Sequence, residues 1–339
     1  MQDYKISMLR KIININCLMT FLVVGIHASY RISPIAEYNS IETILPRYVN
    51  VLCDMAVPTF FSISAYLFFL RFQMSDYIKK LCGRIKSLLI PYFIFSALGF
   101  VLINGKLLLK GESLKIHNAM DALSSLLWAD FNPPIWYLLT LFSFVIVTPL
   151  LYLLLKAKQS KIFVFVLSII SYMVNICFDI PYSNLIFWLP VIIPFSYLGI
   201  NRKNIFNETF IKSRIIRSLV LFLTILLPIF FVGANEHSNS YYTYRILSPF
   251  FILLLCSDMF DFKPFGWAKY TFMVYLSHSL ILVLLEHFQV HNLGSGLIKW
   301  CIVFILCLLI SGGGKETFTE FIWCIKWWSL KKWKYLCFR

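Results

Sequence analysis

Two histidines lie inside apolar stretches of this sequence, where an ionisable ring is costly. His27 stands in FLVVGIHASY, residues 21–30, and His278 stands in TFMVYLSHSLIL. Imidazole titrates near neutrality, so it can act as a general base or carry a transferred group briefly. Both histidines are therefore candidates for chemistry. The structural alternatives are a histidine satisfied at the outer interface of a membrane for His27, and a buried histidine bonded to a neighbouring carbonyl for His278.

Each histidine shares a helical face with other polar residues. At 100° per residue, Asn16 and Thr20 fall on the same face as His27, with Asn16 about 16 Å away along the axis. Tyr275 lies on the same side of its helix as His278. Polar residues at membrane depth are expensive and are functional candidates by default. We therefore predict that Asn16, Thr20 and Tyr275 line a substrate path.

Two charged residues and one aromatic residue extend this candidate set. Asp54 precedes Pro58, which predicts a kink, and Arg245 is a lone cation near the outer end of its apolar run. Trp136 follows two prolines and is a candidate substrate platform. The alternatives are a solvated interfacial carboxylate for Asp54, a snorkelling side chain for Arg245 and an interfacial aromatic belt for Trp136.

A basic segment, KKLCGRIKSLLIPYF, contains Lys80, Arg84 and Lys86 just before an apolar run. Such a cluster can bind the phosphates of a cytosolic cofactor. The alternative is that these charges only set the orientation of the chain in the membrane.

The amino-acid composition indicates whether these residues lie in a soluble domain or in a membrane. Of 339 residues, 59% are hydrophobic and 14% are charged, against about 45–50% and about 25% in soluble domains. The apolar excess recurs along the whole chain, which indicates a polytopic membrane protein. The net charge of +15 lies between apolar runs and not in a basic module, so no nucleic-acid partner is expected. No Cys/His ligand spacing appears, so no metal is expected.

Ten charge-poor runs are each long enough to cross a bilayer, which takes about 20 mainly apolar residues. With the N-terminus inside, about three quarters of the 31 lysines and arginines fall in cytoplasmic segments, as the positive-inside rule requires. We therefore predict an all-α polytopic membrane protein with about ten transmembrane helices and cytoplasmic N- and C-termini. The runs are 12–30, 48–70, 87–105, 131–155, 162–178, 180–201, 218–235, 241–257, 270–289 and 296–314.

Two segments outside these runs have their own character. Apolar residues recur at helical spacing in the outer loop 106–130, which predicts a helix on the membrane surface. Residues 315–339 are rich in Trp and Lys and are predicted to anchor at the inner interface. The predicted organisation is a membrane domain over residues 1–314 followed by an interfacial cytoplasmic tail over 315–339.

Five segments, in this order, resemble the integral-membrane acyltransferase family 3. NCLMTFLVVGIHAS resembles the first helix of that family, which ends in His, and AVPTFFSISAYLFF resembles its second helix. KKLCGRIKSLLIPYF resembles its basic stretch, IWYLLTLFSFVIVTPLL its Trp-Phe-Leu helix and TFMVYLSHSLIL its late Tyr-x-x-His helix. The resemblance covers nearly the whole chain.

This resemblance implies a multi-pass enzyme of the bacterial cytoplasmic (inner) membrane. Such an enzyme moves an acyl group, commonly acetyl, from an acyl-CoA such as acetyl-CoA to a hydroxyl of a cell-surface polysaccharide or its lipid-linked precursor. No bound cofactor is implied, and the expected partners are the acyl-CoA, the glycan or lipid-linked sugar acceptor and the lipid bilayer. By position, the resemblance implies catalytic roles for His27 and His278 and donor binding by Lys80, Arg84 and Lys86. Asp54 is added as a third catalytic candidate.

The chain departs from the family pattern at three places. Asn16 stands where many members have Arg, Asp54 stands where many have a basic residue, and Ser64-Ala65 replaces the usual Ser-Gly. The rival interpretation is a non-enzymatic transporter or flippase of glycan intermediates, with His278 and Glu286 as a proton relay.

Overall fold

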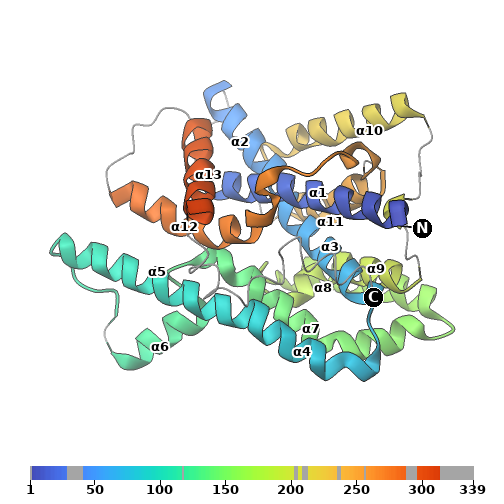
Figure 1. Cartoon of the computed structure of the whole chain (residues 1–339), viewed down its shortest axis with the longest axis horizontal. Helices are drawn as coiled ribbons and strands as arrows, with labels where there is room; N and C mark the ends of the chain where they lie inside the picture. The colour runs from blue at the N-terminus through green and yellow to red at the C-terminus, as the bar shows by residue number, and fades with distance from the viewer. Residues whose placement is uncertain are drawn as a thin grey trace. The chain divides into compact units, whose positions relative to one another are not determined.

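The computed structural model describes residues 2–28, 41–116, 118–201, 205–207, 213–234, 238–255, 257–287 and 296–313. Within these ranges the chain forms helices, turns and loops and no strand (Figure 1). The prediction of an all-α polytopic membrane protein is confirmed. The predicted interfacial tail, residues 315–339, lies outside the described residues.

Membrane-crossing length is found in seven stretches of the described helices. Two shorter apolar helices, Leu185–Asn201 and Ile298–Gly312, coincide with predicted spans. The predicted span 241–257 is divided between an α-helix and a π-helical turn. The count of ten and the cytoplasmic termini therefore stay predictions. The seven stretches are Ile6–Ala28, Ile44–Leu70, Met74–Leu109, Pro133–Lys156, Ser160–Phe178, Arg214–Phe231 and Gly266–Glu286.

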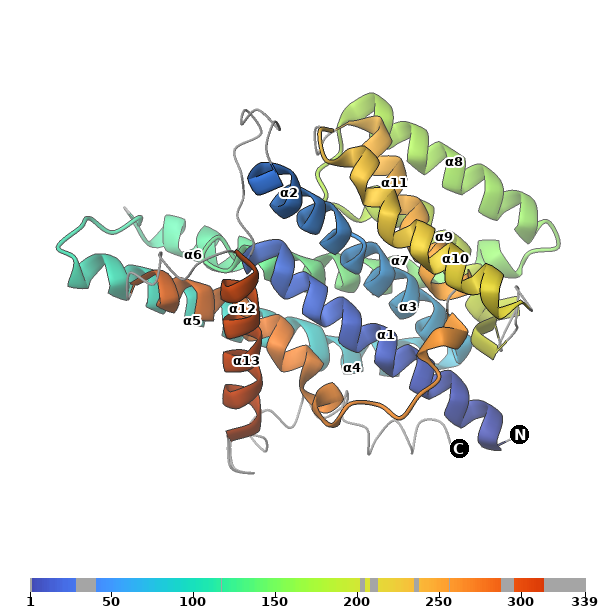
Figure 2. The same cartoon turned by 90° about the horizontal axis from the view of Figure 1, so that it is seen from above.

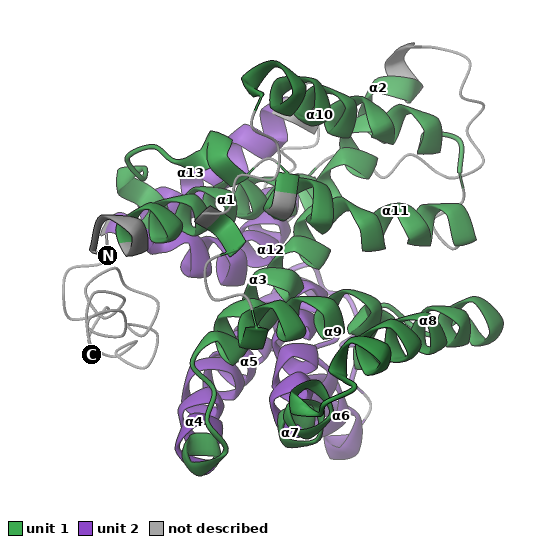
Figure 3. Ribbon diagram, turned by 90° about the vertical axis from the view of Figure 1, so that its right-hand side faces the viewer, with its two compact units in different colours: residues 1–77, 147–268 green, residues 78–146, 269–339 purple. Residues whose placement is uncertain are grey.

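The chain divides into two compact units, which are described separately (Figure 3). Unit 1 comprises Met1–Tyr77 and Val147–Ala268, and unit 2 comprises Ile78–Ile146 and Lys269–Arg339. The predicted membrane domain over residues 1–314 stays a prediction.

Unit 1 is organised around α3 (Ala56–Leu70), which packs most extensively against α9 and also contacts α1 and α11. Figure 2 shows α1 and α3 running side by side. Most side chains of α3 are buried, which suits a central helix without a polar face. The other α-helices of this unit are α1 (Gln2–Ala28), α2 (Ile41–Cys53), α8 (Ser160–Phe178), α9 (Leu185–Asn201), α10 (Arg214–Leu226) and α11 (Asn239–Phe250).

The second apolar stretch is broken between α2 and α3, at Asp54 and Met55. Pro58 has no N–H, so it cannot bond the carbonyl of Asp54 four residues earlier, and the helix is interrupted there. Pro58 itself lies in the first turn of α3, where a missing N–H costs little. The predicted kink is therefore present, but it lies N-terminal to the proline.

Unit 2 pairs α12 (Thr271–His287) with α5 (Ile90–Leu109) and α13 (Gly296–Gly313). The predicted helix in the outer loop is α6 (Ala119–Trp128), which is capped by the Asn118 side chain. Tyr92 and Ser96 of α5 donate hydrogen bonds to the carbonyls of Leu127 and Leu126, which have no partner within α6. This attaches α6 to α5, and its position on the membrane surface stays a prediction.

Two further α-helices and eight short helical turns complete the part of the chain that the structure describes. The helix α4 (Tyr77–Arg84) precedes α5, and α7 (Trp136–Lys156) crosses the boundary between the units. The turns are η1 (Met74–Asp76), η2 (Ile85–Leu89), η3 (Pro133–Ile135), η4 (Ile205–Asn207), η5 (Leu227–Phe231), η6 (Phe251–Leu255), η7 (Ser257–Phe260) and η8 (Gly266–Tyr270), of which η2 and η6 are π-helical.

The close packing of α3 on α9 depends on Gly199. A Cβ at this position would lie 2.5 Å from the backbone oxygen of Tyr66 and 3.1 Å from Cβ of Phe69. Backbone cannot move aside as a flexible side chain can, so any larger residue must push the two helices apart.

We predict that Gly199→Ala lowers the unfolding temperature in detergent, because overpacking costs about 1–3 kcal/mol. The matched control is Gly105→Ala in α5, where a Cβ would meet nothing within 4 Å. That control is expected to keep or slightly raise the unfolding temperature, since Ala favours helix by up to about 1 kcal/mol over Gly. Equal unfolding temperatures for the two variants would contradict the packing argument.

Candidate functional site

In unit 1, Asp54 lies in the break between α2 and α3 and binds two side chains of α11. The Tyr241 hydroxyl donates to Oδ2 of Asp54 at 2.5 Å, and Nη2 of Arg245 donates to the same oxygen at 2.7 Å. The side chains of Asp54 and Arg245 are each only 16% exposed. The break thus gives a carboxylate a place among apolar helices, and α11 supplies its counter-charge.

The guanidinium groups of two arginines lie near the ring of Tyr241. Arg245 stands 4.6 Å from the ring centroid and Arg47 stands 5.7 Å from it. Arg47 donates hydrogen bonds to the carbonyls of Val232 and Ala234 at 3.2 and 2.9 Å. Cations over an aromatic face are attracted by its quadrupole, so the ring helps to hold both groups.

The proline in α11 explains a further contact at this site. Pro249 has no N–H for the carbonyl of Arg245, four residues earlier. The Ser248 hydroxyl donates to that carbonyl at 3.1 Å in its place. The π-helical turn η6 follows directly, so α11 ends in an irregular segment whose freed backbone group still has a partner.

The structure joins two residues that the sequence singled out separately. Asp54 and Arg245 form an ion pair with each other. Asp54 is therefore not a solvated interfacial carboxylate, and Arg245 is not a snorkelling cation. Sequence reasoning missed Tyr241 and Arg47. The spacing of Tyr241 and Arg245, four residues apart on one helical face, was the available signal for Tyr241.

The predicted polar face of α1 is only partly open. Thr20 is 1% exposed, and its hydroxyl donates to the carbonyl of Asn16 at 2.8 Å, so it is turned back onto its own helix. Asn16 and His27 are half-buried, and His27 lies in the last turn of α1. Of the three, His27 and Asn16 keep part of their surface exposed, and their place in a substrate path stays a prediction.

In unit 2, His278 is fully buried in α12. Its Nδ1 lies 2.6 Å from the carbonyl oxygen of Tyr275, one turn earlier. A carbonyl oxygen can only accept, so Nδ1 carries the proton and, in the neutral ring, Nε2 holds the lone pair. This matches the structural alternative for His278, and it also leaves Nε2 in the form that a general base needs.

Tyr275 connects α12 to the segment before α7. Its hydroxyl donates to the carbonyl of Pro134 at 2.6 Å, and its ring lies 5.9 Å from that of Tyr137 and 6.0 Å from that of His278. Trp136 packs edge-on against Tyr137 at 6.4 Å and is half-buried. The structure therefore brings Tyr275, His278 and Trp136 into one aromatic group together with Tyr137, which the sequence already pairs with Trp136.

The predicted basic cluster is divided between two kinds of helix. Lys80 and Arg84 are half-buried and lie four residues apart on α4, and therefore on one face. Lys86 is exposed and stands in the π-helical turn η2.

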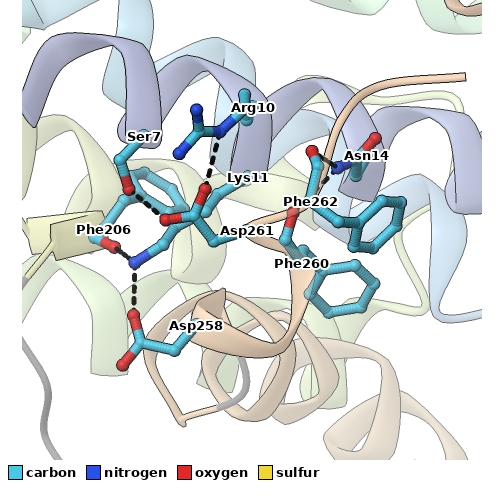
Figure 4. Close-up of polar contacts among 9 residues, drawn as sticks. All are labelled: Ser7, Arg10, Lys11, Asn14, Phe206, Asp258, Phe260, Asp261 and Phe262. Carbon is cyan, nitrogen blue, oxygen red and sulfur yellow. Dashed lines mark hydrogen bonds and ion pairs between the residues drawn. The ribbon is translucent and has the colours of Figure 1, made fainter. Parts of the chain in front are cut away.

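A separate polar group connects the first half of α1 to the segment around η7 (Figure 4). Lys11, which is buried, forms an ion pair with Oδ1 of Asp258 and donates to the carbonyl of Phe206 at 2.8 Å. Oδ2 of the same carboxylate accepts from Arg217 at 2.7 Å. Asp258 therefore connects α1, η7 and α10.

A second carboxylate continues this contact. Asp261 accepts from Arg10 at Oδ1, 2.8 Å away, and from Ser7 at Oδ2, 2.5 Å away. Burial raises the pKa of Asp261, but the hydrogen bonds from Ser7 and Arg10 and the charges of Arg10 and Lys11 outweigh it and hold the pKa below its usual range. Asn14 adds hydrogen bonds to the carbonyls of residues 260 and 262 (Figure 4).

Two other features bear on the chemistry. Within the described ranges, no group of three or more His, Cys, Asp or Glu residues could hold a metal ion. Glu286, the predicted relay partner of His278, instead lies 4.0 Å from Lys106 of α5 and is about half exposed. The relay between His278 and Glu286 stays a prediction.

A comparison with known families gives one match. The sequence model of acyltransferase family 3, described as an acyltransferase domain, matches residues 12–313. No curated protein and no solved structure matches the chain significantly. The resemblance inferred from the sequence is confirmed.

The pKa of Asp261 predicts a pH-dependent stability. Because the folded pKa lies below the usual value of 3.8, the unfolded chain takes up the proton first as the pH falls. The contribution of Asp261 is therefore complete above pH 3.8 and is lost as the pH falls through the folded pKa. Asp261→Asn should unfold at a lower temperature than wild type near pH 6. The difference in unfolding temperature should shrink as the pH falls below 3.8 and should disappear once the pH is below the folded pKa of Asp261. A difference that persists unchanged at pH 3 would contradict this.

Proposed function

Because the chain belongs to acyltransferase family 3, we propose that it transfers an acyl group, in the first place acetyl, from an acyl-CoA to a hydroxyl group of a cell-surface polysaccharide or its lipid-linked precursor. The match over residues 12–313, in a chain of apolar helices, makes it a multi-pass membrane acyltransferase. That match is the observation that carries the proposal. The acyl-CoA donor, the glycan acceptor and a place in the bacterial inner membrane are the proposed parts.

Donor binding is assigned to the basic face of α4. Lys80 and Arg84 lie on one side of that helix, and Lys86 follows in an exposed position. Cations of this kind suit the phosphates of CoA, and the planar guanidinium of Arg84 can bind a phosphate through two hydrogen bonds. In the predicted topology this segment is cytoplasmic, where acyl-CoA is available.

The reaction requires a base for the hydroxyl proton. The sugar oxygen attacks the thioester carbonyl, the new C–O ester bond forms, and the C–S bond breaks to release the CoA thiolate. The imidazole takes the hydroxyl proton and passes it to the departing thiolate. His27 is the first candidate because it is half-buried at a helix end, and it serves either as this base or as a transient acyl carrier.

His278 is the second candidate. Its Nδ1 proton is held by the carbonyl of Tyr275, so Nε2 has the basic lone pair. Its environment differs from that of His27, because it is fully enclosed. Measuring both activity and unfolding temperature in variants of the two histidines therefore distinguishes a role in the reaction from a role in packing.

The direct test uses membranes that contain the protein, radiolabelled acetyl-CoA and de-O-acylated surface polysaccharide from a strain that lacks it. Label in base-labile esters of the polysaccharide supports the proposal. Altered export of glycan with no change in its ester content would instead support a transporter.

We predict that His27→Ala lowers ester formation by roughly 100- to 10,000-fold, the usual range for a lost general acid–base group. The unfolding temperature should change little, because the side chain is only half-buried. The measurement is initial rate against protein amount after detergent extraction. Wild-type rates in a properly inserted His27→Ala protein would remove His27 from the mechanism.

For His278→Ala, we predict a large loss of stability, on the order of 2–5 kcal/mol for a truncated core side chain. His278→Gln keeps a side-chain hydrogen-bonding group and should recover most of that stability. If His278 acts in the chemistry, His278→Gln stays inactive while it unfolds near the wild-type temperature. Recovery of both activity and stability would limit His278 to a packing role.

A further inference from the structure

The two oxygens of Asp54 are used unequally. Tyr241 and Arg245 both donate to Oδ2, and among the residues that the structure describes Oδ1 receives no hydrogen bond. The side chain keeps 16% of its surface exposed, so Oδ1 is not sealed inside the protein. Oδ2 is therefore held by two donors, and Oδ1 is left to accept a hydrogen bond from a ligand.

Two further paired carboxylates among the described residues of unit 1 show a different pattern (Figure 4). Asp258 accepts from Lys11 at Oδ1 and from Arg217 at Oδ2. Asp261 also divides its donors, Arg10 and Ser7, between its two oxygens. In these two residues both oxygens serve contacts within the protein, as expected of structural braces.

The position of Asp54 makes its unused oxygen significant. The residue interrupts the stretch Ile44–Leu70, which is long and apolar enough to cross a membrane. Charged groups within such stretches are costly and are functional candidates by default. Because part of the Asp54 side chain is exposed, a ligand at this break can reach Oδ1.

The charge of the site restricts what that group can be. A carboxylate only accepts hydrogen bonds, so the ligand must donate one. The negative charge of Asp54 is already balanced by Arg245 at 2.7 Å, and Arg47 lies near the same Tyr241 ring, so a further cation would be repelled by two guanidinium groups. A neutral donor, such as a hydroxyl group, is therefore favoured over an ammonium group or a metal ion.

We propose that Oδ1 of Asp54 binds a hydroxyl group of the polyhydroxylated acceptor, and that Tyr241 and Arg245 are positioning residues that orient the carboxylate. This inference rests on the proposed function for the identity of the acceptor. It assigns to Asp54 the binding of the acceptor rather than of the acyl donor.

The main variant is Asp54→Asn, which keeps the size of the side chain. Tyr241 and Arg245 both donate, so they orient the amide with its oxygen toward them. The amide nitrogen then replaces Oδ1, and a donor faces the ligand in place of an acceptor. With acetyl-CoA and de-O-acylated surface polysaccharide as substrates, the KM for polysaccharide should rise about tenfold or more. The KM for acetyl-CoA should stay within about twofold of wild type.

The matched control is Asp261→Asn, the same chemical change at a carboxylate that uses both oxygens internally. Its KM for polysaccharide should equal that of wild type. Tyr241→Phe removes one donor from Oδ2 and should raise the KM for polysaccharide less than Asp54→Asn does. All assays are run below the unfolding temperatures of the variants. An unchanged KM for polysaccharide in Asp54→Asn, or an equal rise in both KM values, overturns the proposal.

A donor-free measurement separates this inference from the proposed function. Polysaccharide should raise the unfolding temperature of wild type and of Asp261→Asn, but not that of Asp54→Asn. If wild type forms no ester and still shows this difference, the proposed transfer is wrong and the binding role of Asp54 stands. Equal shifts in wild type and Asp54→Asn, or no shift in wild type, overturn the binding role.

Discussion

A polar group among apolar helices has no water to bond to, and this constraint explains most of the contacts described above. Two irregular points in the described helices show a replacement partner. Pro249 removes a donor from the carbonyl of Arg245, and Ser248 supplies another. The carbonyls at the end of α6 are bonded by Tyr92 and Ser96. At these two places a neighbouring side chain completes the hydrogen bonding that the helix itself leaves open.

The same constraint selects the residues that can do chemistry. Asp54 is stable at its helix break because Tyr241 and Arg245 hold one of its oxygens. The carbonyl of Tyr275 fixes the tautomer of the neutral His278 ring, with the proton on Nδ1. Acyl transfer needs groups with defined protonation and direction, and a low-dielectric surrounding both enforces that definition and strengthens its effect.

The fold class and most of the apolar runs could be predicted because they depend on local composition. Polar residues within apolar runs could also be recognised in the sequence, so Asp54 and Arg245 were both predicted as candidate site residues. Their pairing was not visible, since 191 positions separate them and the pairing depends on how α11 packs against α3. The break near Pro58 was expected at the proline, but the lost hydrogen bond belongs to the carbonyl four residues earlier. Tyr241 stayed hidden because a tyrosine in an apolar run looks like packing until its hydroxyl is placed.

Asp258 forms ion pairs with two cations that come from different helices, Lys11 and Arg217. Because the carboxylate is shared, mutation of Asp258 and mutation of one of the two cations have different consequences. Loss of either cation leaves a balanced pair, whereas loss of the carboxylate leaves two positive charges facing each other with little water between them. During evolution, substitutions of Lys11 or Arg217 should therefore be tolerated before substitutions of Asp258. A change at Asp258 should survive only after one of them has become neutral, which gives the order of permitted substitutions a direction.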